Sequence, residues 1–295
     1  MISVVNSDET ITWGELFQKT SVDLGSEQEA RWLCEHASGL DASEFSSGLS
    51  EIVSERCGVA LREMVRRRIL GEPLQYVMQR WSFRHLDVFV DPRVLIPRPE
   101  TELVVQVALD TLRNTAQEID RKIRVVDLGT GSGVIGLALA SELPLGKTEV
   151  WLTDISADAL DVARANLAGL GLVDGDVRLA QGDWFSALPH QHKNSFDLII
   201  SNPPYIAIYD SSVEPVVRDY EPHLALYAGT DGLDAYRQII SQAGEWLATD
   251  GLLVLEIGND QALLIRSLLD ENGFKDIEIR QDYSQLDRIA LARKH

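Results

Sequence analysis

The feature that most constrains the fold is a glycine-rich loop between an apolar segment and a helical one. Residues 123–128 form an apolar run of the length of a buried strand, Gly129, Gly131 and Gly133 follow it, and residues 134–143 have a helical pattern. Because glycine has no Cβ, such a loop lets a ligand approach the backbone closely at the carboxyl end of a sheet. Dinucleotide and nucleoside sites both use this arrangement, so the loop alone leaves the ligand class open.

Strands and helices alternate regularly after this loop. Further strands are expected at residues 148–153, 177–180, 196–201, 252–256, 275–280 and 288–293. Helices are expected at residues 156–170, 233–247 and 260–272. This alternation predicts an α/β fold, a mostly parallel seven-stranded sheet with helices on both faces. The last two strands lie too close in the chain for a crossover, so we expect them to form an antiparallel pair at one edge.

The first part of the chain has the pattern of short helices. Thr12 and Ser26 each precede a glutamate three residues later, which is the capping-box pattern. A third helix is expected at residues 54–70, ending before Gly71. Its inward-facing residues are expected to be Val59, Met64, Val65 and Ile69.

The same helix also carries Arg62, Arg66, Arg67 and Arg68. We interpret them as a solvated face paired with Glu55 and Glu63; the alternative is a surface for an acidic partner or RNA phosphate. Farther along, the alternation of residues 86–90, a turn at Asp91-Pro92 and the apolar residues 93–96 predict a β-hairpin. The expected organisation is therefore a helical domain at residues 1–75, a β-hairpin linker at 76–97 and the sheet domain at 98–295.

Composition limits the classes of function. The 295 residues carry a formal net charge of -19, which disfavours nucleic acid as a substrate. Cys34 and Cys57 have no metal-ligand spacing and suit a reducing compartment. The N-terminus lacks a signal-peptide pattern, and no apolar run is long enough to span a bilayer. The sequence predicts a cytoplasmic globular protein without a membrane anchor.

A second informative motif, Asn202-Pro203-Pro204-Tyr205, directly follows the strand expected at 196–201. Two prolines fix two φ angles and remove two backbone donors, so the chain leaves the sheet in a stiff turn. The Asn202 side chain and the Pro203 carbonyl are then free to accept hydrogen bonds beside the Tyr205 ring. Two acceptors next to a flat apolar face suit a planar –NH2 group.

Acidic residues at strand ends narrow the ligand class. Asp154 ends the second strand, where a carboxylate can accept hydrogen bonds from both hydroxyls of a ribose. The alternating glycines after Asp127 depart from the dinucleotide pattern and resemble the S-adenosylmethionine loop of Rossmann-like methyltransferases. After the third strand, Asp183 or a backbone amide is expected to meet the adenine amine and Trp184 to cover the adenine ring, although core packing explains Trp184 equally well. The residues expected to bind S-adenosylmethionine are Asp127, Gly129, Thr130, Gly131, Ser132, Gly133, Asp154, Asp183, Trp184 and Asn202.

Ligands of such sheets bind at the switch point, where the loops after the first and fourth strands meet. The acceptors at Asn202 and Pro203 would therefore face the cofactor. An amide nitrogen is a poor nucleophile, and gripping both of its N–H bonds would direct its lone pair toward the methyl group. Such orientation can supply on the order of 7–11 kcal/mol of a barrier. We expect no catalytic base and no metal ion, and we expect His190 and His192 to be exposed to solvent.

The chain resembles one family over nearly its whole length, the glutamine methyltransferases of peptide chain release factors (HemK/PrmC type). The resemblance is carried by Gly71–Tyr76, Val94–Glu102, Asp127–Gly133, Gly182–Leu188, Asn202–Tyr205 and Tyr220–Pro222. It implies a Rossmann-like class I methyltransferase domain, an N-terminal domain that docks the release factor, and methylation of the glutamine amide in that factor's Gly-Gly-Gln motif. The residues it implies for catalysis and substrate binding are Asn202, Pro203, Pro204 and Tyr205, with Arg98 and Glu100 as further substrate contacts.

Two departures and two alternatives accompany this resemblance. Gln79, which follows Tyr76-Val77-Met78, and His85 stand where the family usually has glycine, which leaves substrate docking near the hairpin open. The first alternative function is a DNA or RNA methyltransferase acting on an exocyclic amine, which would use the same Asn202–Tyr205 motif on a flipped base. The second is a non-catalytic S-adenosylmethionine-binding scaffold, which would be expected to lack the amine acceptors.

Overall fold

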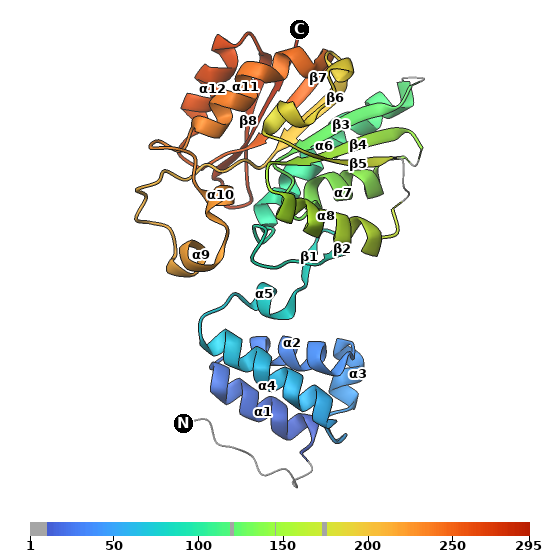
Figure 1. Ribbon diagram of the computed structural model, residues 1–295, viewed down its shortest axis with the longest axis vertical. Coiled ribbons are helices and arrows are strands. Elements are labelled where there is room, and N and C mark those ends of the chain that lie inside the picture. Colours follow the sequence, from blue (N-terminus) through green and yellow to red (C-terminus); the bar gives the residue numbers. More distant parts are fainter. Residues whose placement is uncertain (1–10, 119–120, 145, 173–175) are drawn as a thin grey trace. The chain divides into compact units, whose positions relative to one another are not determined.

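The computed structural model describes residues 11–118, 121–144, 146–172 and 176–295. The chain divides into two compact units, one ending at Gln79 and the other beginning at Arg80 (Figure 1). Among the described residues, no helix has both the length and the apolar character needed to cross a lipid bilayer.

The first unit is all-helical. Its helices are α1 (Trp13–Leu24), α2 (Glu27–Ser38), α3 (Ala42–Ser47), α4 (Glu55–Ile69) and α5 (Leu74–Met78). Thr12 and Glu15 form the expected capping box at α1, and Ser26 and Ser54 cap α2 and α4. Trp13, Phe45 and Leu61 belong to the apolar core that these helices share. Helix α3 was not expected from the sequence.

The inward face of α4 was only partly predicted. Met64 and Val65 are buried as expected, but Val59 and Ile69 are exposed by 52% and 57%. Leu61 is also buried, and its spacing of three and four residues to Met64 and Val65 places these three on one face of the helix. Val59 and Ile69 lie off that face. The prediction was wrong there because it took apolar character alone as a sign of burial.

Three of the arginines on α4 are paired with carboxylates within this unit. Arg66 binds Glu63 as expected, whereas Arg67 binds Glu72 and Arg68 binds Glu29. These pairs support the interpretation of a solvated, acid-paired face.

The hairpin was predicted in the wrong place. Its strands are β1 (Trp81–Phe83) and β2 (Leu86–Val88), and no strand forms at residues 93–96. Arg84 occupies the turn with φ of +53°. Its guanidinium binds Glu142, and its backbone N–H donates to the Glu102 carboxylate. These two contacts hold Arg84 in a backbone conformation that favours glycine.

The second unit contains the seven-stranded sheet. Its strands are β3 (Ile123–Leu128), β4 (Thr148–Asp154), β5 (Val177–Gln181), β6 (Phe196–Ser201), β7 (Leu247–Glu256), β8 (Lys275–Gln281) and β9 (Asp287–Arg293). The spatial order is β5-β4-β3-β6-β7-β9-β8, parallel except for the pairs that involve β9. This confirms the expected α/β sheet and its antiparallel edge pair.

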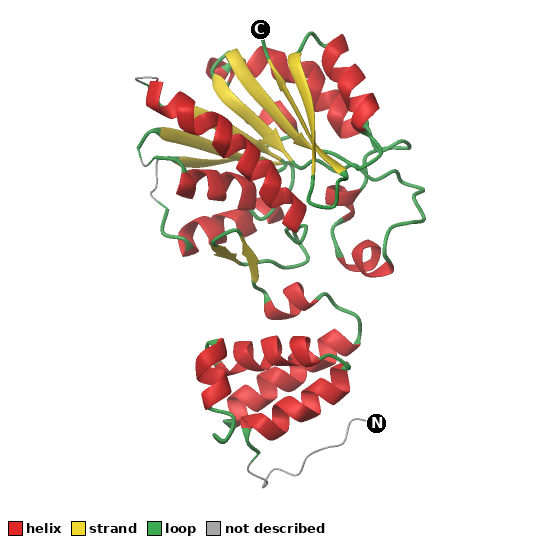
Figure 2. Cartoon of the chain, turned by 180° about the vertical axis from the view of Figure 1, so that it is seen from behind, coloured by secondary structure: helices red, strands yellow, loops and turns green. Residues whose placement is uncertain are grey.

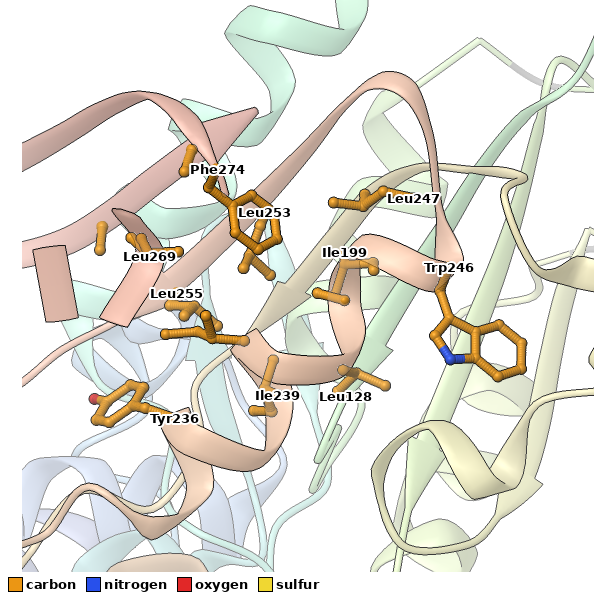
Figure 3. Packing of buried hydrophobic residues seen from close by; sticks show 14 of the residues in the cluster. Leu128, Ile199, Tyr236, Ile239, Trp246, Leu247, Leu253, Leu255, Leu269 and Phe274 are labelled. Carbon is orange, nitrogen blue, oxygen red and sulfur yellow. The ribbon is translucent and has the colours of Figure 1, made fainter. Parts of the chain in front are cut away.

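Helices cover both faces of this sheet. They are α6 (Pro99–Glu118), α7 (Val134–Glu142), α8 (Ala157–Gly169), α11 (Asp234–Trp246) and α12 (Ala262–Glu271). Helices α11 and α12 pack on one face of the sheet, while α6, α7 and α8 pack on the other. Figure 2 shows the sheet and these helices from the side opposite to Figure 1. Figure 3 shows the core on the α11 and α12 side, where Leu128, Ile199 and Leu253 from three strands meet Ile239 of α11.

Short elements that the sequence did not predict follow β5 and β6. They are the 3-10 helices η1 (Trp184–Ala187) and η2 (His190–His192) and the helices α9 (Pro215–Tyr220) and α10 (His223–Leu226). His190 is exposed as expected, but His192 is half-buried against the Trp151 ring, at 5.2 Å between ring centroids. Burial lowers the pKa of His192, and its prediction as a solvent-exposed residue was wrong.

Candidate active site

The carboxyl ends of β3 and β6 lie side by side. The two strands pair in parallel, and the Ser201 hydroxyl at the end of β6 donates to the Leu128 carbonyl at the end of β3, 2.6 Å away. The loops that follow these strands are therefore held next to each other. This is the switch point of the sheet, where the sequence predicted that the glycine loop and the Asn202 motif would meet.

Both loops line one cavity of about 610 Å³. Such a volume is in the range of small-molecule sites. Polar side chains gather along it from distant parts of the chain; they include Arg98, Thr101, Asp154, Ser156, Asp183 and Asn202. Apolar groups complete the wall, among them Trp184, Ile155 and Pro204. The cavity is thus a mixed polar and apolar site within the second unit.

Asp127 braces the glycine loop from below. It is fully buried, and its Oδ2 accepts hydrogen bonds from the Thr130 hydroxyl at 2.6 Å and the Gly136 N–H at 3.0 Å. Burial raises its pKa to about 7. Asp127 is absent from the cavity wall, and no group of the described residues bonds its Oδ1. Its contacts hold the turn from the loop into α7.

The glycines of the loop are needed for their backbone conformation. Gly129, Gly131 and Gly133 all have positive φ angles, of 69°, 55° and 88°. This left-handed region favours glycine, so other residues at these positions would be strained. Gly129, Thr130, Gly131 and Ser132 line the cavity, and Gly133 turns the chain into α7.

Asp154 lies at the carboxyl end of β4 and lines the cavity. Its Oδ2 accepts from the Gly131 N–H and its Oδ1 from the Ser156 N–H, each at 2.9 Å. Burial raises its pKa. The carboxylate is therefore oriented by backbone donors on both sides, at the position expected for the ribose.

The Asn202 motif divides between the cavity and the core. Asn202 and Pro204 line the cavity, whereas Pro203 is buried and Tyr205 packs against the core. Burial, with a smaller contribution from the negative charge of Glu256, raises the pKa of the Tyr205 phenol to about 12. Tyr205 is thus neutral and anchored, and its backbone carbonyl accepts from the Gln261 amide.

Arg98 lines the cavity while paired with a buried acid. Its guanidinium binds Glu221 at 2.5 Å, and the Ile96 N–H donates to the second oxygen of Glu221 at 3.1 Å. Glu221 therefore ties the segment before α6 to the segment after α9. Glu100 is half-buried and does not line the cavity. The acid of Tyr220-Glu221-Pro222 was noted in the sequence, but its pairing with Arg98 was not expected.

Comparison with known proteins identifies the family. A model named PrmC N-terminal domain matches residues 9–78, and one named Methyltransferase small domain matches residues 104–218. The release factor glutamine methyltransferase of Burkholderia pseudomallei is 37% identical over 285 residues, which covers 96% of each chain. The namesake enzyme of Gloeobacter violaceus is 41% identical and covers 89% of each chain. The chain belongs to the release factor glutamine methyltransferases.

Solved structures agree on the fold of this glutamine methyltransferase. A T. thermophilus 16S rRNA N2 G1207 methyltransferase in complex with AdoMet and guanosine aligns with a TM-score of 0.51 and 18% identity. That alignment covers 73% of this chain and 50% of the other. A methyltransferase from Pyrococcus furiosus aligns with a TM-score of 0.50 and 18% identity, over 78% and 97% of the two chains. At these identities the likeness shows the fold alone, which is that of class I methyltransferases.

The residues of the cavity fit the cofactor that this family uses. A nucleoside needs a paired acceptor for its ribose, and the Asp154 carboxylate is held at the strand end by two backbone donors. Close approach of a ligand to the backbone needs positions without a Cβ atom, and Gly129 and Gly131 supply them. Trp184 lines the same wall and offers a flat apolar face to a ring. S-adenosylmethionine is therefore compatible with the polar and apolar groups present.

Proposed function

We propose that this protein methylates the side-chain amide nitrogen of the glutamine in the Gly-Gly-Gln motif of peptide chain release factors, with S-adenosylmethionine as methyl donor. The observation that carries the proposal is the position of Asn202, whose amide lines the same cavity as the glycine loop. Membership of the release factor glutamine methyltransferases, at 37% identity over 96% of the chain, supports the choice of substrate.

The cofactor is assigned to one side of the cavity. We assign its ribose to Asp154, its adenine to Asp183 and Trp184, and its closest backbone contacts to Gly129–Gly133. Thr130 and Ser132 are assigned with the loop, and Asp127 acts through the loop by bonding Thr130 and Gly136. When bound, S-adenosylmethionine supplies a methyl group on a sulfonium, which becomes a neutral thioether once the methyl group is transferred. The amide nitrogen gains the methyl group and gives up one of its two protons to water.

The substrate amide is assigned to Asn202 and Pro203. The Asn202 Oδ1 and the Pro203 carbonyl would each accept one N–H of the glutamine amide, which aims the nitrogen lone pair and stabilises positive charge as it develops. Pro204 stiffens the turn. Tyr205, which the sequence led us to expect on the substrate amide, is partly buried against the core and supports the turn from there. Arg98, held by its ion pair with Glu221, would contact the substrate. Glu100 would contact the release factor outside the glutamine amide.

The remaining assignments concern partners and location. We propose that the helical unit docks the release factor, that residues 76–97 link it to the methyltransferase domain, and that the enzyme acts in the cytoplasm, where termination factors work. Nucleic acid is not the substrate in this proposal. The net charge of -19 and the acid-paired arginines of α4 support that choice.

A comparison of three substrate classes tests this function. The enzyme is incubated with methyl-labelled S-adenosylmethionine and, separately, a purified release factor, duplex DNA and ribosomal RNA. We expect label in the release factor alone. Label in DNA or RNA without label in the release factor would refute the proposal and favour the exocyclic-amine alternative.

A further inference from the structure

A buried carboxylate lies behind Asn202. Glu256 ends β7 and is only 2% exposed. The Thr101 hydroxyl of α6 donates to Glu256 Oε2 at 2.7 Å, and the Asn202 Nδ2 donates to the same hydroxyl at 3.2 Å. Three side chains far apart in sequence therefore form one chain of hydrogen bonds that ends at the cavity.

The chemistry of the three groups gives this chain a direction. A carboxylate only accepts hydrogen bonds, so the Thr101 hydroxyl must use its single proton toward Glu256. The hydroxyl then has only lone pairs left for Asn202. The amide of Asn202 must accordingly present its –NH2 end to Thr101, because its oxygen would meet an acceptor there.

This orientation leaves the other end of the amide for a ligand. No donor among residues 11–118, 121–144, 146–172 and 176–295 reaches the Asn202 Oδ1. Asn202 and Thr101 both line the cavity. The Oδ1 is thus a preoriented acceptor, which is what binding of an amide N–H requires. If the amide were reversed, the same position would hold a donor and would repel that N–H.

The surroundings of Glu256 show that the carboxylate is set in place by several elements. The positive charges of Arg98 and Arg288 and the negative charge of Glu100 all act on it. The Tyr205 phenol is within electrostatic range of Glu256, and the Tyr236 hydroxyl donates to the Glu256 backbone carbonyl at 2.9 Å. Tyr236 is among the core residues labelled in Figure 3. The Tyr236 bond fixes the backbone from which the Glu256 side chain extends.

We propose that Glu256 and Thr101 are positioning residues that hold the Asn202 amide with its oxygen toward the substrate glutamine. They act through Asn202 and contact neither the methyl donor nor the acceptor nitrogen. The inference rests on the proposed function, because it takes an amide N–H as the group that Asn202 accepts.

Two substitutions of Thr101 separate the hydroxyl from its packing. Thr101→Val keeps the shape and removes the proton donor, and we expect kcat to fall about 10- to 100-fold, less than for loss of the acceptor itself. Thr101→Ser keeps the hydroxyl and should restore kcat to within about threefold of the wild type. Affinity for S-adenosylmethionine, measured by calorimetry, should stay within about threefold in both variants.

A second valine substitution controls for general effects of removing a buried hydroxyl. Thr148 is 4% exposed, and its hydroxyl has no hydrogen-bond partner among the described residues. Thr148→Val should therefore leave kcat unchanged.

A double-mutant cycle distinguishes positioning from a merely structural role. Asn202→Ala alone should lower kcat roughly 10²–10³-fold. If Thr101 acts through Asn202, adding Thr101→Val to Asn202→Ala should lower kcat by less than about twofold more. The same cycle is measured with Glu256→Gln, whose amide can donate to Thr101 and so frees the hydroxyl to donate to the Asn202 oxygen.

The outcomes are decisive for each claim. The proposal is supported if Thr101→Val and Glu256→Gln lower kcat in the wild type but not in the Asn202→Ala background, and if Thr101→Ser retains kcat. The proposal is overturned if these substitutions lower kcat equally in the wild-type and Asn202→Ala backgrounds. It is also overturned if Thr101→Val and Glu256→Gln both keep the wild-type kcat. A wild-type enzyme that labels no release factor refutes the proposed function instead, so the two failures are distinguishable.

Discussion

The ring of Trp184 lies against Gly129, so that a Cβ on Gly129 would lie 3.4 Å from the ring carbon Cζ3. Trp184 itself has φ of +45°, a left-handed conformation that is uncommon for a bulky residue. The glycine loop and the segment after β5 are therefore fitted to each other. Both line the cavity that we assign to the cofactor.

Gly129→Ala should weaken binding of S-adenosylmethionine by about tenfold or more, because a residue with a side chain at φ of +69° is strained by about 1–3 kcal/mol. The added methyl group also contacts Trp184. Calorimetric titration measures the affinity. Gly244→Ala is the matched control, since Gly244 lies within α11 with open space around it. Equal affinities in both variants would contradict the role of the loop.

Asp154→Ala should weaken binding of S-adenosylmethionine and leave kcat at saturation near the wild-type value, because Asp154 is assigned to the ribose and lies away from the methyl acceptor. Direct titration and the dependence of rate on cofactor concentration separate the two effects. Asp161→Ala serves as the control, because Asp161 is exposed on α8. An unchanged affinity in Asp154→Ala would refute the ribose assignment.

The centre of the sheet was predictable because strands such as β3 and β6 are buried on both faces. The strands expected at residues 123–128 and 196–201, which are mostly apolar, match β3 and β6 residue for residue. The order of the strands then placed Asn202 beside the glycine loop, and the structure brings these loops together.

The hairpin was misplaced because an apolar segment after a turn signal was taken as a strand. Val94 and Ile96 are buried, but Ile96 donates its N–H to the Glu221 carboxylate and Arg98 binds the same acid. The apolar segment is thus held by a side chain from 125 residues away, which no local pattern contains. Prolines on both sides of it also remove the donors that a ladder needs.

The positioning of Asn202 was missed for a related reason. Glu256 looked like the last residue of an apolar strand, and Thr101 was given no role in the site. Their hydrogen bond joins residues 155 positions apart. The local signal that points to this role is Glu256 itself, an acid at the end of a strand whose preceding residues are buried on both faces.

Asp127 makes the stability of the ligand-free enzyme depend on pH. Its folded-state pKa is raised from 3.8 to about 7 by burial, so it contributes stability that is complete below about pH 4 and lost as the pH rises toward 7. Asp127→Asn cannot ionise, so its free energy of unfolding relative to the wild type should increase between pH 4 and 7 and change little above. Urea unfolding at several pH values measures this difference, and a constant difference would contradict the raised pKa.

The rate should depend on the ionisation of Glu256. Burial raises its pKa to about 7, the Thr101 hydrogen bond and the charges of Arg288 and Arg98 oppose the shift, and Glu100 adds to it. Below this pKa the protonated acid can donate to Thr101, and the orientation of Asn202 is no longer enforced. We expect kcat to rise with pH through about 7 in the wild type and this inflection to be absent in Glu256→Gln. The same inflection in both enzymes would assign it to another group.

The measurement that tests the central claim most directly is methyl transfer to a release factor and to the same factor with its Gly-Gly-Gln glutamine replaced. The labelled protein is digested, and the labelled peptide is identified by mass spectrometry. We predict one methyl group on the amide nitrogen of that glutamine and no label in the replaced factor. Label that persists after replacement of the glutamine would contradict the account.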